Sequence, residues 1–201
     1  MKKLKTVVVI FFIFFASNAL RAAELDAQFY YDKANEHYNA GEYSKAIDAY
    51  SKVISIYPDL IKAYYNRGLA YYRVGRYDKA IEDYNMVLSG QNKNAEIYGN
   101  RAIAYLRAGK YAEAIEDYNT VIYLSPRSFD AYHNRGIAYA STGRYDEALA
   151  DYNRAIGINS DDDNLYVSRG VAYVKKAMED FRNACDRGNK NACENLKQLS
   201  R

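Results

Sequence analysis

The sequence predicts an all-α protein built from repeated helical hairpins, and three observations carry this prediction. Aromatic, glycine and alanine positions recur every 34 residues along most of the chain. Within each unit, aromatic and small residues are spaced three and four apart, which places them on one face of a helix. A glycine between two such runs separates two helices in each complete unit. The chain is therefore expected to stack helix pairs around a continuous core.

The recurring columns define the elements of each unit in order. The first helices carry the aromatic column Tyr30, Tyr64, Tyr98, Tyr132 and Tyr166. The turns carry Gly41, Gly75, Gly109 and Gly143. The second helices carry Ala46, Ala80, Ala114 and Ala148, followed by Tyr50, Tyr84, Tyr118 and Tyr152. Two further tyrosine columns recur at the same period, Tyr43, Tyr77, Tyr111 and Tyr145, and Tyr71, Tyr105, Tyr139 and Tyr173. The four columns together hold seventeen of the 23 tyrosines, so most of the tyrosine excess is expected to serve core packing.

Two stretches, YYNRGLAYYRVGRYDKAIEDYNMVL and YHNRGIAYASTGRYDEALADYNRAI, resemble the tetratricopeptide repeat (TPR) family. The resemblance extends over residues 27–162, although tyrosine replaces the usual tryptophan. It implies a right-handed α-solenoid of antiparallel helix pairs, the TPR superhelix. The expected organisation is four complete repeats at 27–60, 61–94, 95–128 and 129–162, followed by a shortened fifth repeat at 163–201 with a C-terminal capping helix.

The first 22 residues are interpreted as a signal peptide. A basic start is followed by an apolar run that is shorter than the roughly 20 residues needed to span a bilayer, and then by small residues. Cleavage is expected after Ala19 or Ala22, which makes the protein periplasmic or secreted from a bacterium. An uncleaved signal anchor in the inner membrane is the alternative. Cleavage at Ala19 removes three lysines and no acid, so the mature chain has 25 basic against 25 acidic residues.

An arginine column is paired with an acidic column sixteen residues further along the chain. The pairs are Arg67 with Asp83, Arg101 with Asp117 and Arg135 with Asp151, and the shortened repeat has Arg169 with Asp180, eleven residues on. The first repeat has Lys33 and Ala49 instead, so both partners are lost together. This correlation predicts structural ion pairs within one repeat or between neighbouring repeats.

The fifth repeat lacks five residues of the pattern, including the glycine and tyrosine of the turn. Its two helices are expected to fuse, with a strained turn at Lys175 and Lys176 as the alternative. The segment ACDRGNKNACENL resembles Sel1-like repeats, whose cysteines bridge two helices, and this resemblance together with export implies a Cys185–Cys193 disulfide. A pair of buried thiols is the alternative. Leu196 and Leu199 are expected to cover the last apolar face.

Nothing in the sequence predicts catalysis, a cofactor or a metal site. No nucleophile has a matched base, no glycine-rich phosphate loop is present, and the two histidines lie in different repeats from the cysteines. The acidic run at Ser160–Asn164 falls where a helix begins, where the helix dipole favours acids. A neutral exported chain without a basic stripe is not expected to bind nucleic acid.

The resemblance places a binding groove on the concave face formed by the first helices. The candidate groove residues are Tyr31, Asn35, Tyr38, Tyr65, Asn66, Leu69, Tyr72, Arg73, Asn100, Arg107 and Asn134. The asparagines at 66, 100 and 134 recur at the repeat period and can bond a peptide backbone, unless asparagine is simply common there. The four tyrosines lie outside the packing columns and are candidate anchors for a ligand, with partial burial between helices as the alternative. Ile103 and His133 are further inward positions.

The sequence thus predicts an exported, non-enzymatic scaffold that binds a peptide or partner protein in its groove. The first alternative is a glycan-associated role in cell-envelope or polysaccharide assembly, with tyrosines stacking on sugar rings. The second is a self-assembling module that forms weak homo-oligomers through an uncovered repeat end near Tyr30. The membrane is expected as a partner only if the signal is uncleaved.

Overall fold

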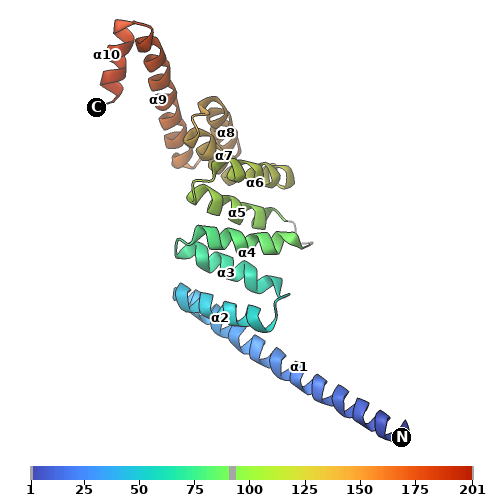
Figure 1. Ribbon diagram of the computed structural model, residues 1–201. Helices are drawn as coiled ribbons and strands as arrows, with labels where there is room; N and C mark the ends of the chain where they lie inside the picture. Colours follow the sequence, from blue (N-terminus) through green and yellow to red (C-terminus); the bar gives the residue numbers. More distant parts are fainter. Residues whose placement is uncertain (1, 91–93, 201) are drawn as a thin grey trace. The chain divides into compact units, whose positions relative to one another are not determined.

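The computed structural model describes the backbone of residues 2–90 and 94–200, and the side chains of residues 21–90 and 94–200. These residues form ten helices and no strand, which confirms the predicted all-α class (Figure 1). The predicted signal segment at 1–22 lies largely outside the described side chains, so its role stays a prediction. The chain divides into two compact units, Met1–Asn92 and Lys93–Arg201.

The first unit contains four helices, each packed against the next in the chain (Figure 1). They are α1 (Lys2–Asn39), α2 (Tyr43–Ile56), α3 (Ile61–Arg73) and α4 (Tyr77–Ser89). The second unit contains six further helices that also pack in chain order. They are α5 (Ala95–Arg107), α6 (Tyr111–Leu124), α7 (Phe129–Ser141), α8 (Tyr145–Ile158), α9 (Asp163–Asp186) and α10 (Lys190–Leu199).

The hairpin turn has the same backbone conformation in every complete repeat. Gly75, between α3 and α4, has φ +75°, in the left-handed region that glycine adopts without a Cβ clash. Its N–H donates to the Tyr72 carbonyl at 3.0 Å, and the N–H of Arg76 donates to the Tyr71 carbonyl at 2.9 Å. These bonds end α3 and reverse the chain into α4, as at other helix C-termini that close on glycine.

The core of each complete repeat is a buried tyrosine of the second helix beneath a small residue of the first. Tyr84 of α4 is 1% exposed, and a Cβ built on Gly68 of α3 would lie 2.8 Å from its Cε1 atom. The equivalent distance from Gly136 of α7 to Cε1 of Tyr152 is 2.6 Å. The small-residue column is therefore a steric requirement of this ring packing.

The predicted arginine–aspartate pairs are confirmed in the second, third and fourth repeats. Nε and Nη2 of Arg67 donate to the two carboxylate oxygens of Asp83 at 2.9 and 2.7 Å, and Nη1 donates to Ser51 Oγ of α2 at 3.0 Å. The guanidinium also lies 5.5 and 5.7 Å from the ring centres of Tyr64 and Tyr71. Each such arginine joins the two helices of its own repeat, and those at 67 and 135 also donate to the preceding helix, to Ser51 of α2 and Asn119 of α6.

The arginine of the shortened repeat does not follow this pattern, so the predicted Arg169–Asp180 pair is wrong. Arg169 Nη1 instead donates to Asn153 Oδ1 of α8 at 2.7 Å. Because α9 runs without a break through residues 163–186, the fused alternative is the one observed. Residues 169 and 180 are then roughly 16 Å apart along one helix axis, too far for a bidentate pair.

The last two helices, α9 and α10, form a further helical hairpin. Gly188 turns the chain between them, and Cys185 and Cys193 lie at disulfide distance, with 2.00 Å between their Sγ atoms. The helix α10 packs against α9. Leu196 is half-buried and Leu199 is 42% exposed, so the two leucines expected to cover the last apolar face are only partly buried.

Candidate functional site

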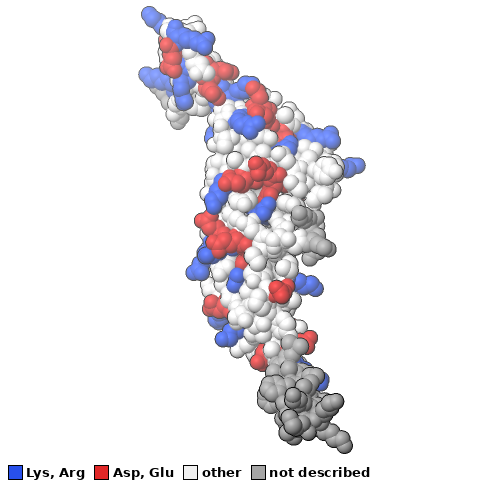
Figure 2. All heavy atoms as spheres, turned by 45° about the vertical axis from the view of Figure 1, so that its right-hand side comes forward, with Lys and Arg blue, Asp and Glu red and all other residues white. Residues whose placement is uncertain are grey.

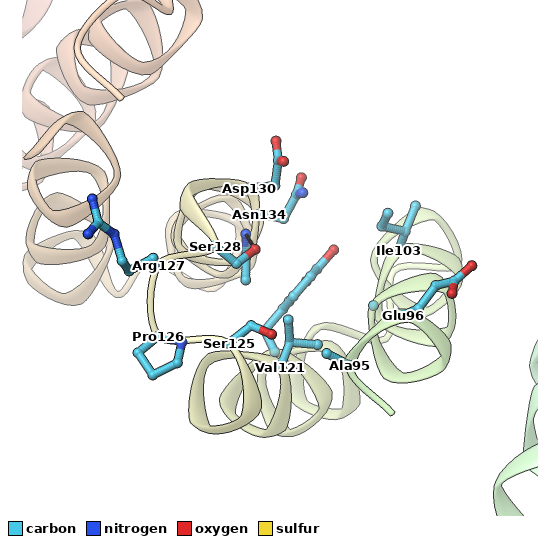
Figure 3. A pocket seen from close by; sticks show the side chains of 13 residues that line it. Ala95, Glu96, Ile103, Val121, Ser125, Pro126, Arg127, Ser128, Asp130 and Asn134 are labelled. Atoms are coloured by element: carbon cyan, nitrogen blue, oxygen red, sulfur yellow. Dashed lines mark hydrogen bonds between the residues drawn. The ribbon is translucent and has the colours of Figure 1, made fainter. Parts of the chain in front are cut away.

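A cavity of about 560 Å³ lies in the second unit, between the first helices α5 and α7 and against α6. Its lining combines apolar and polar side chains, with Ile103 on α5, Val121 on α6 and Asn134 on α7 (Figure 3). The loop Ser125–Ser128, which contains Pro126, forms one wall. Two of these lining positions, Ile103 and Asn134, are among the inward positions that the sequence predicted.

The cavity coincides with an interruption in a column of rings. The residues at this position of the first four repeats are Tyr31, Tyr65, Gly99 and His133. Three of these carry a ring that contacts the buried tyrosine of the second helix of the same repeat. The centroid distances are 5.9 Å for Tyr31 and Tyr50, 6.2 Å for Tyr65 and Tyr84, and 5.8 Å for His133 and Tyr152. Gly99 has no ring, and both Gly99 and Tyr118 line the cavity.

The predicted tyrosines of the first unit lie in packing contacts between helices. The rings of Tyr38 and Tyr72 contact those of Tyr43 and Tyr77, at centroid distances of 5.3 and 5.5 Å. All four predicted tyrosines, at 31, 38, 65 and 72, are half-buried. The structure therefore shows the partial burial that the sequence analysis gave as the alternative to ligand contact.

The polar candidates of the first unit are largely engaged with these rings. Tyr50 donates its hydroxyl hydrogen to Asn35 Oδ1 at 2.6 Å, and Asn66 Nδ2 donates to Tyr31 Oη at 2.9 Å. Leu69 is half-buried in α3. A hydrogen bond with Tyr38 raises the pKa of Arg73, whose side chain is exposed. The asparagine at 66 thus stabilises its neighbouring repeat.

The candidates of the second unit are divided between the cavity and the exposed surface. Asn134 lines the cavity and is half-buried. Asn100 is half-buried in α5, whereas Arg107 at the end of α5 is exposed. Neither of these two lines the cavity. Gly99 was missed by sequence reasoning, although the interrupted column of 31, 65, 99 and 133 is visible in the sequence.

Burial shifts the pKa values of the groups in the column of rings and of the buried tyrosines that these rings contact. Burial lowers the pKa of His133 despite the opposing influence of Asp162 and Asp130, so the ring favours the neutral form. Its Nε2 lies 2.9 Å from Ser168 Oγ on α9. Burial likewise raises the pKa of Tyr50 and of Tyr152 to about 12. None of these phenols ionises at neutral pH, so they act as hydrogen-bonding and apolar groups.

The exposed charges of both signs are interspersed on the face shown in Figure 2, in several places side by side. Within the described residues, no three or more histidine, cysteine or carboxylate side chains form a group that could hold a metal ion. No helix among the described residues is long and apolar enough to cross a membrane.

The helix pairs define a class of protein, the α-solenoid built from repeated hairpins. Three TPR family models match the chain, at residues 34–75 ("TPR repeat"), 59–125 ("Tetratricopeptide repeat") and 100–163 ("Tetratricopeptide repeat"). Together they span residues 34–163 without a gap. The chain is therefore built from tetratricopeptide repeats, as the resemblance implied.

Solved structures agree with this assignment. The crystal structure of MamA protein superposes with a TM-score of 0.71 at 26% identity, covering 87% of this chain and 90% of MamA. A tetratricopeptide repeat protein from Parabacteroides merdae gives 0.70 at 20% identity, with 87% and 72% covered. YrrB, described as a TPR protein with an unusual peptide-binding site, gives 0.66 at 20% identity, with 91% and 89% covered. The predicted solenoid class is confirmed, and no curated protein sequence matches the chain.

Proposed function

We propose that this protein is an exported, non-catalytic scaffold that binds a peptide segment of a partner protein on the face formed by its first helices. One observation carries the proposal: a cavity of about 560 Å³ opens between α5 and α7 and is lined by Ile103 and Asn134, two predicted groove positions. Ligand sites are typically concave and mostly apolar, with a few placed polar groups. The description of YrrB as peptide-binding supports the same role for this fold.

The other predicted groove residues support the proposal differently from what the sequence suggested. Because the tyrosines at 31, 38, 65 and 72 pack between helices, they shape the face on which a peptide would lie. Direct contact is expected at the cavity and at exposed positions such as Arg73. Residues 163–201 serve in this proposal as a Sel1-like terminal repeat, supported by the cysteine pair between α9 and α10.

The test is site-specific photo-crosslinking in the living bacterium. A photoreactive residue at Ile103, inside the cavity lining, is compared with one at Glu116, an exposed position on α6 that does not line it. A defined protein adduct from position 103 and none from position 116 supports the proposal. Equal protein adducts from both sites contradict the proposal. Retention of polysaccharide alone also contradicts it and favours the glycan role. An adduct with a second copy of this chain favours the self-assembling module.

Export is tested separately from binding. The protein recovered from the periplasm or medium is expected to have the intact mass of a chain that begins at Leu20 or Ala23, corresponding to cleavage after Ala19 or Ala22. A chain recovered only with its first 22 residues and with the membrane fraction would instead indicate the signal-anchored alternative.

A further inference from the structure

We infer that the Gly99 cavity is a receptor for one tyrosine side chain of the bound peptide, which occupies the place that the protein's own ring fills in the other repeats. This inference rests on the proposed function and names the chemistry that its site recognises. It follows from comparing the third repeat with the first and fourth, in which the equivalent contacts are complete.

A filled ring position has two contacts, and they are the same in two different repeats. In the first repeat, the Tyr31 ring meets the Tyr50 ring at a centroid distance of 5.9 Å, and the Tyr31 hydroxyl oxygen accepts a hydrogen bond from Asn66 Nδ2 at 2.9 Å. In the fourth repeat, the His133 ring meets Tyr152 at 5.8 Å and bonds Ser168 at 2.9 Å. In both cases the polar partner lies 35 residues beyond the ring, on the next first helix.

The third repeat contains both partners of a ring but not the ring itself. The residue 35 positions beyond Gly99 is Asn134, and the tyrosine equivalent to Tyr50 and Tyr152 is Tyr118. Both line the cavity. Within the part of the chain that the structure describes, the Asn134 amide makes no hydrogen bond, unlike Asn66. Figure 3 shows Asn134, Ile103 and Val121 around the same space.

The vacant space suits a phenol better than an aliphatic side chain. A ligand ring that packs against the Tyr118 ring would gain an edge or tilted contact of the kind seen in the first, second and fourth repeats. Measured aromatic pairs of this kind contribute about 0.5–1.5 kcal/mol in addition to the energy of burying their surface. The free amide of Asn134 can donate to a phenolic oxygen, as the amide of Asn66 does to Tyr31. An aliphatic occupant would leave that half-buried amide unpaired.

The rim of the cavity adds a charge preference. Glu96 of α5 and Asp130 of α7 line the opening and are exposed, whereas Arg127 extends away from the cavity in Figure 3. Two carboxylates at the opening favour a peptide whose tyrosine is flanked by basic residues. Exposed ion pairs contribute about 0.2–1 kcal/mol each, so this preference should be a severalfold effect in affinity.

The first experiment uses p-cresol, the side chain of tyrosine, as a probe of the full-length mature protein observed by NMR. We expect p-cresol to shift the methyl signals of Val121 and Ile103 and the side-chain amide of Asn134. Gly99→Tyr is expected to abolish these shifts because it fills the space with the protein's own ring. Gly99→Ala should retain them, since its Cβ would lie 3.9 Å from Val121 Cγ2, an ordinary contact.

A matched control separates a filled cavity from a general effect of adding tyrosine. Val167 occupies the same column in the fifth repeat, is 64% exposed and does not line the cavity, so Val167→Tyr adds the ring away from the site. It should leave p-cresol binding unchanged. Asn134→Leu should weaken p-cresol about threefold to tenfold, matching one lost hydrogen bond, and leave toluene binding the same or stronger. Equal binding of p-cresol to the wild type and to Gly99→Tyr overturns the inference.

The second experiment uses acetylated, amidated pentapeptides and measures affinity by titration. The order expected is GKYKG tighter than GEYEG, with GKAKG showing no binding at the cavity. If the crosslinked partner from position 103 is still captured after Gly99→Tyr, the proposed function stands and the tyrosine inference fails. If no partner is captured but the peptides follow the expected order, the cavity chemistry holds and the proposed function fails. Self-association abolished by Gly99→Tyr would assign the cavity to a second copy, for instance through the exposed Tyr123, and would overturn a peptide partner.

Discussion

The fourth repeat, formed by α7 and α8, and the fifth repeat, whose first helix is part of α9, share the column residues of a first helix but differ in how these residues pack. Tyr132, Arg135 and Gly136 have their equivalents in Tyr166, Arg169 and Gly170. In the fourth repeat, the glycine lies against a ring and the arginine holds two partners. In the fifth, a Cβ on the glycine would meet nothing within 4 Å, and Tyr166 and Tyr173 are 42% and 53% exposed. The columns of a first helix therefore become structural only when a second helix supplies their partners.

The largest effect is expected from removing the ring that the second helix supplies. Tyr152→Ala in α8 should reduce the free energy of unfolding by about 3–5 kcal/mol, because the ring is 2% exposed and fills the space beneath Gly136. Tyr173→Ala in α9 should cost under about 1 kcal/mol, since its ring is half in water. Urea denaturation of the two variants measures both values. Equal losses would show that α9 is packed as tightly as a complete repeat.

The next effect comes from the carboxylate that the second helix supplies. Asp151→Ala should reduce the free energy of unfolding by about 3 kcal/mol, because it leaves the guanidinium of Arg135 without its bidentate partner beside two rings. Asp180→Ala is the matched control in the fifth repeat, where the carboxylate is exposed, and should be within about 0.5 kcal/mol of the wild type. A large loss in Asp180→Ala would restore the pair that the sequence predicted.

These pairs mark what the sequence could predict and what it could not. The hairpins, the turn glycines and the arginine pairs of complete repeats were predictable because each appears several times at one period and requires only local geometry. The partner of Arg169 was not, because it depends on how α9 continues after the missing turn. The groove tyrosines were assigned to ligand contact since periodicity places a residue on a helix face without saying what covers that face. Gly99 indicates a cavity only when it is compared with the ring-bearing residues at the same position of the other repeats.

The glycine column should give effects of opposite sign in the two repeats. Gly136→Ala is expected to destabilise by about 1–3 kcal/mol, because the new Cβ would lie 2.6 Å from Tyr152 Cε1 and the buried ring must move. Gly170→Ala should stabilise by about 0.5–1 kcal/mol, since alanine is favoured inside a helix and its Cβ meets nothing within 4 Å. Thermal melts of both variants measure the signs. Destabilisation by both would mean that α9 has a covering partner in solution.

The smallest effect is a pH dependence at the contact between the two repeats, where His133 bonds Ser168 of α9. Burial lowers the pKa of His133 below its usual 6.5, although Asp130 and Asp162 oppose the shift. The unfolded chain therefore binds a proton at a higher pH than the folded chain, so the free energy of unfolding should fall as the pH drops below about 6.5. His133→Tyr, which copies the first and second repeats, should remove this contribution while keeping the ring contact with Tyr152. Comparing the two proteins by denaturation between pH 7.5 and the onset of acid unfolding isolates the histidine, and identical profiles would show that its burial is lost in solution. A slope that survives Ser168→Ala but not His133→Tyr would assign the effect to burial of the ring rather than to its bond with the shortened repeat.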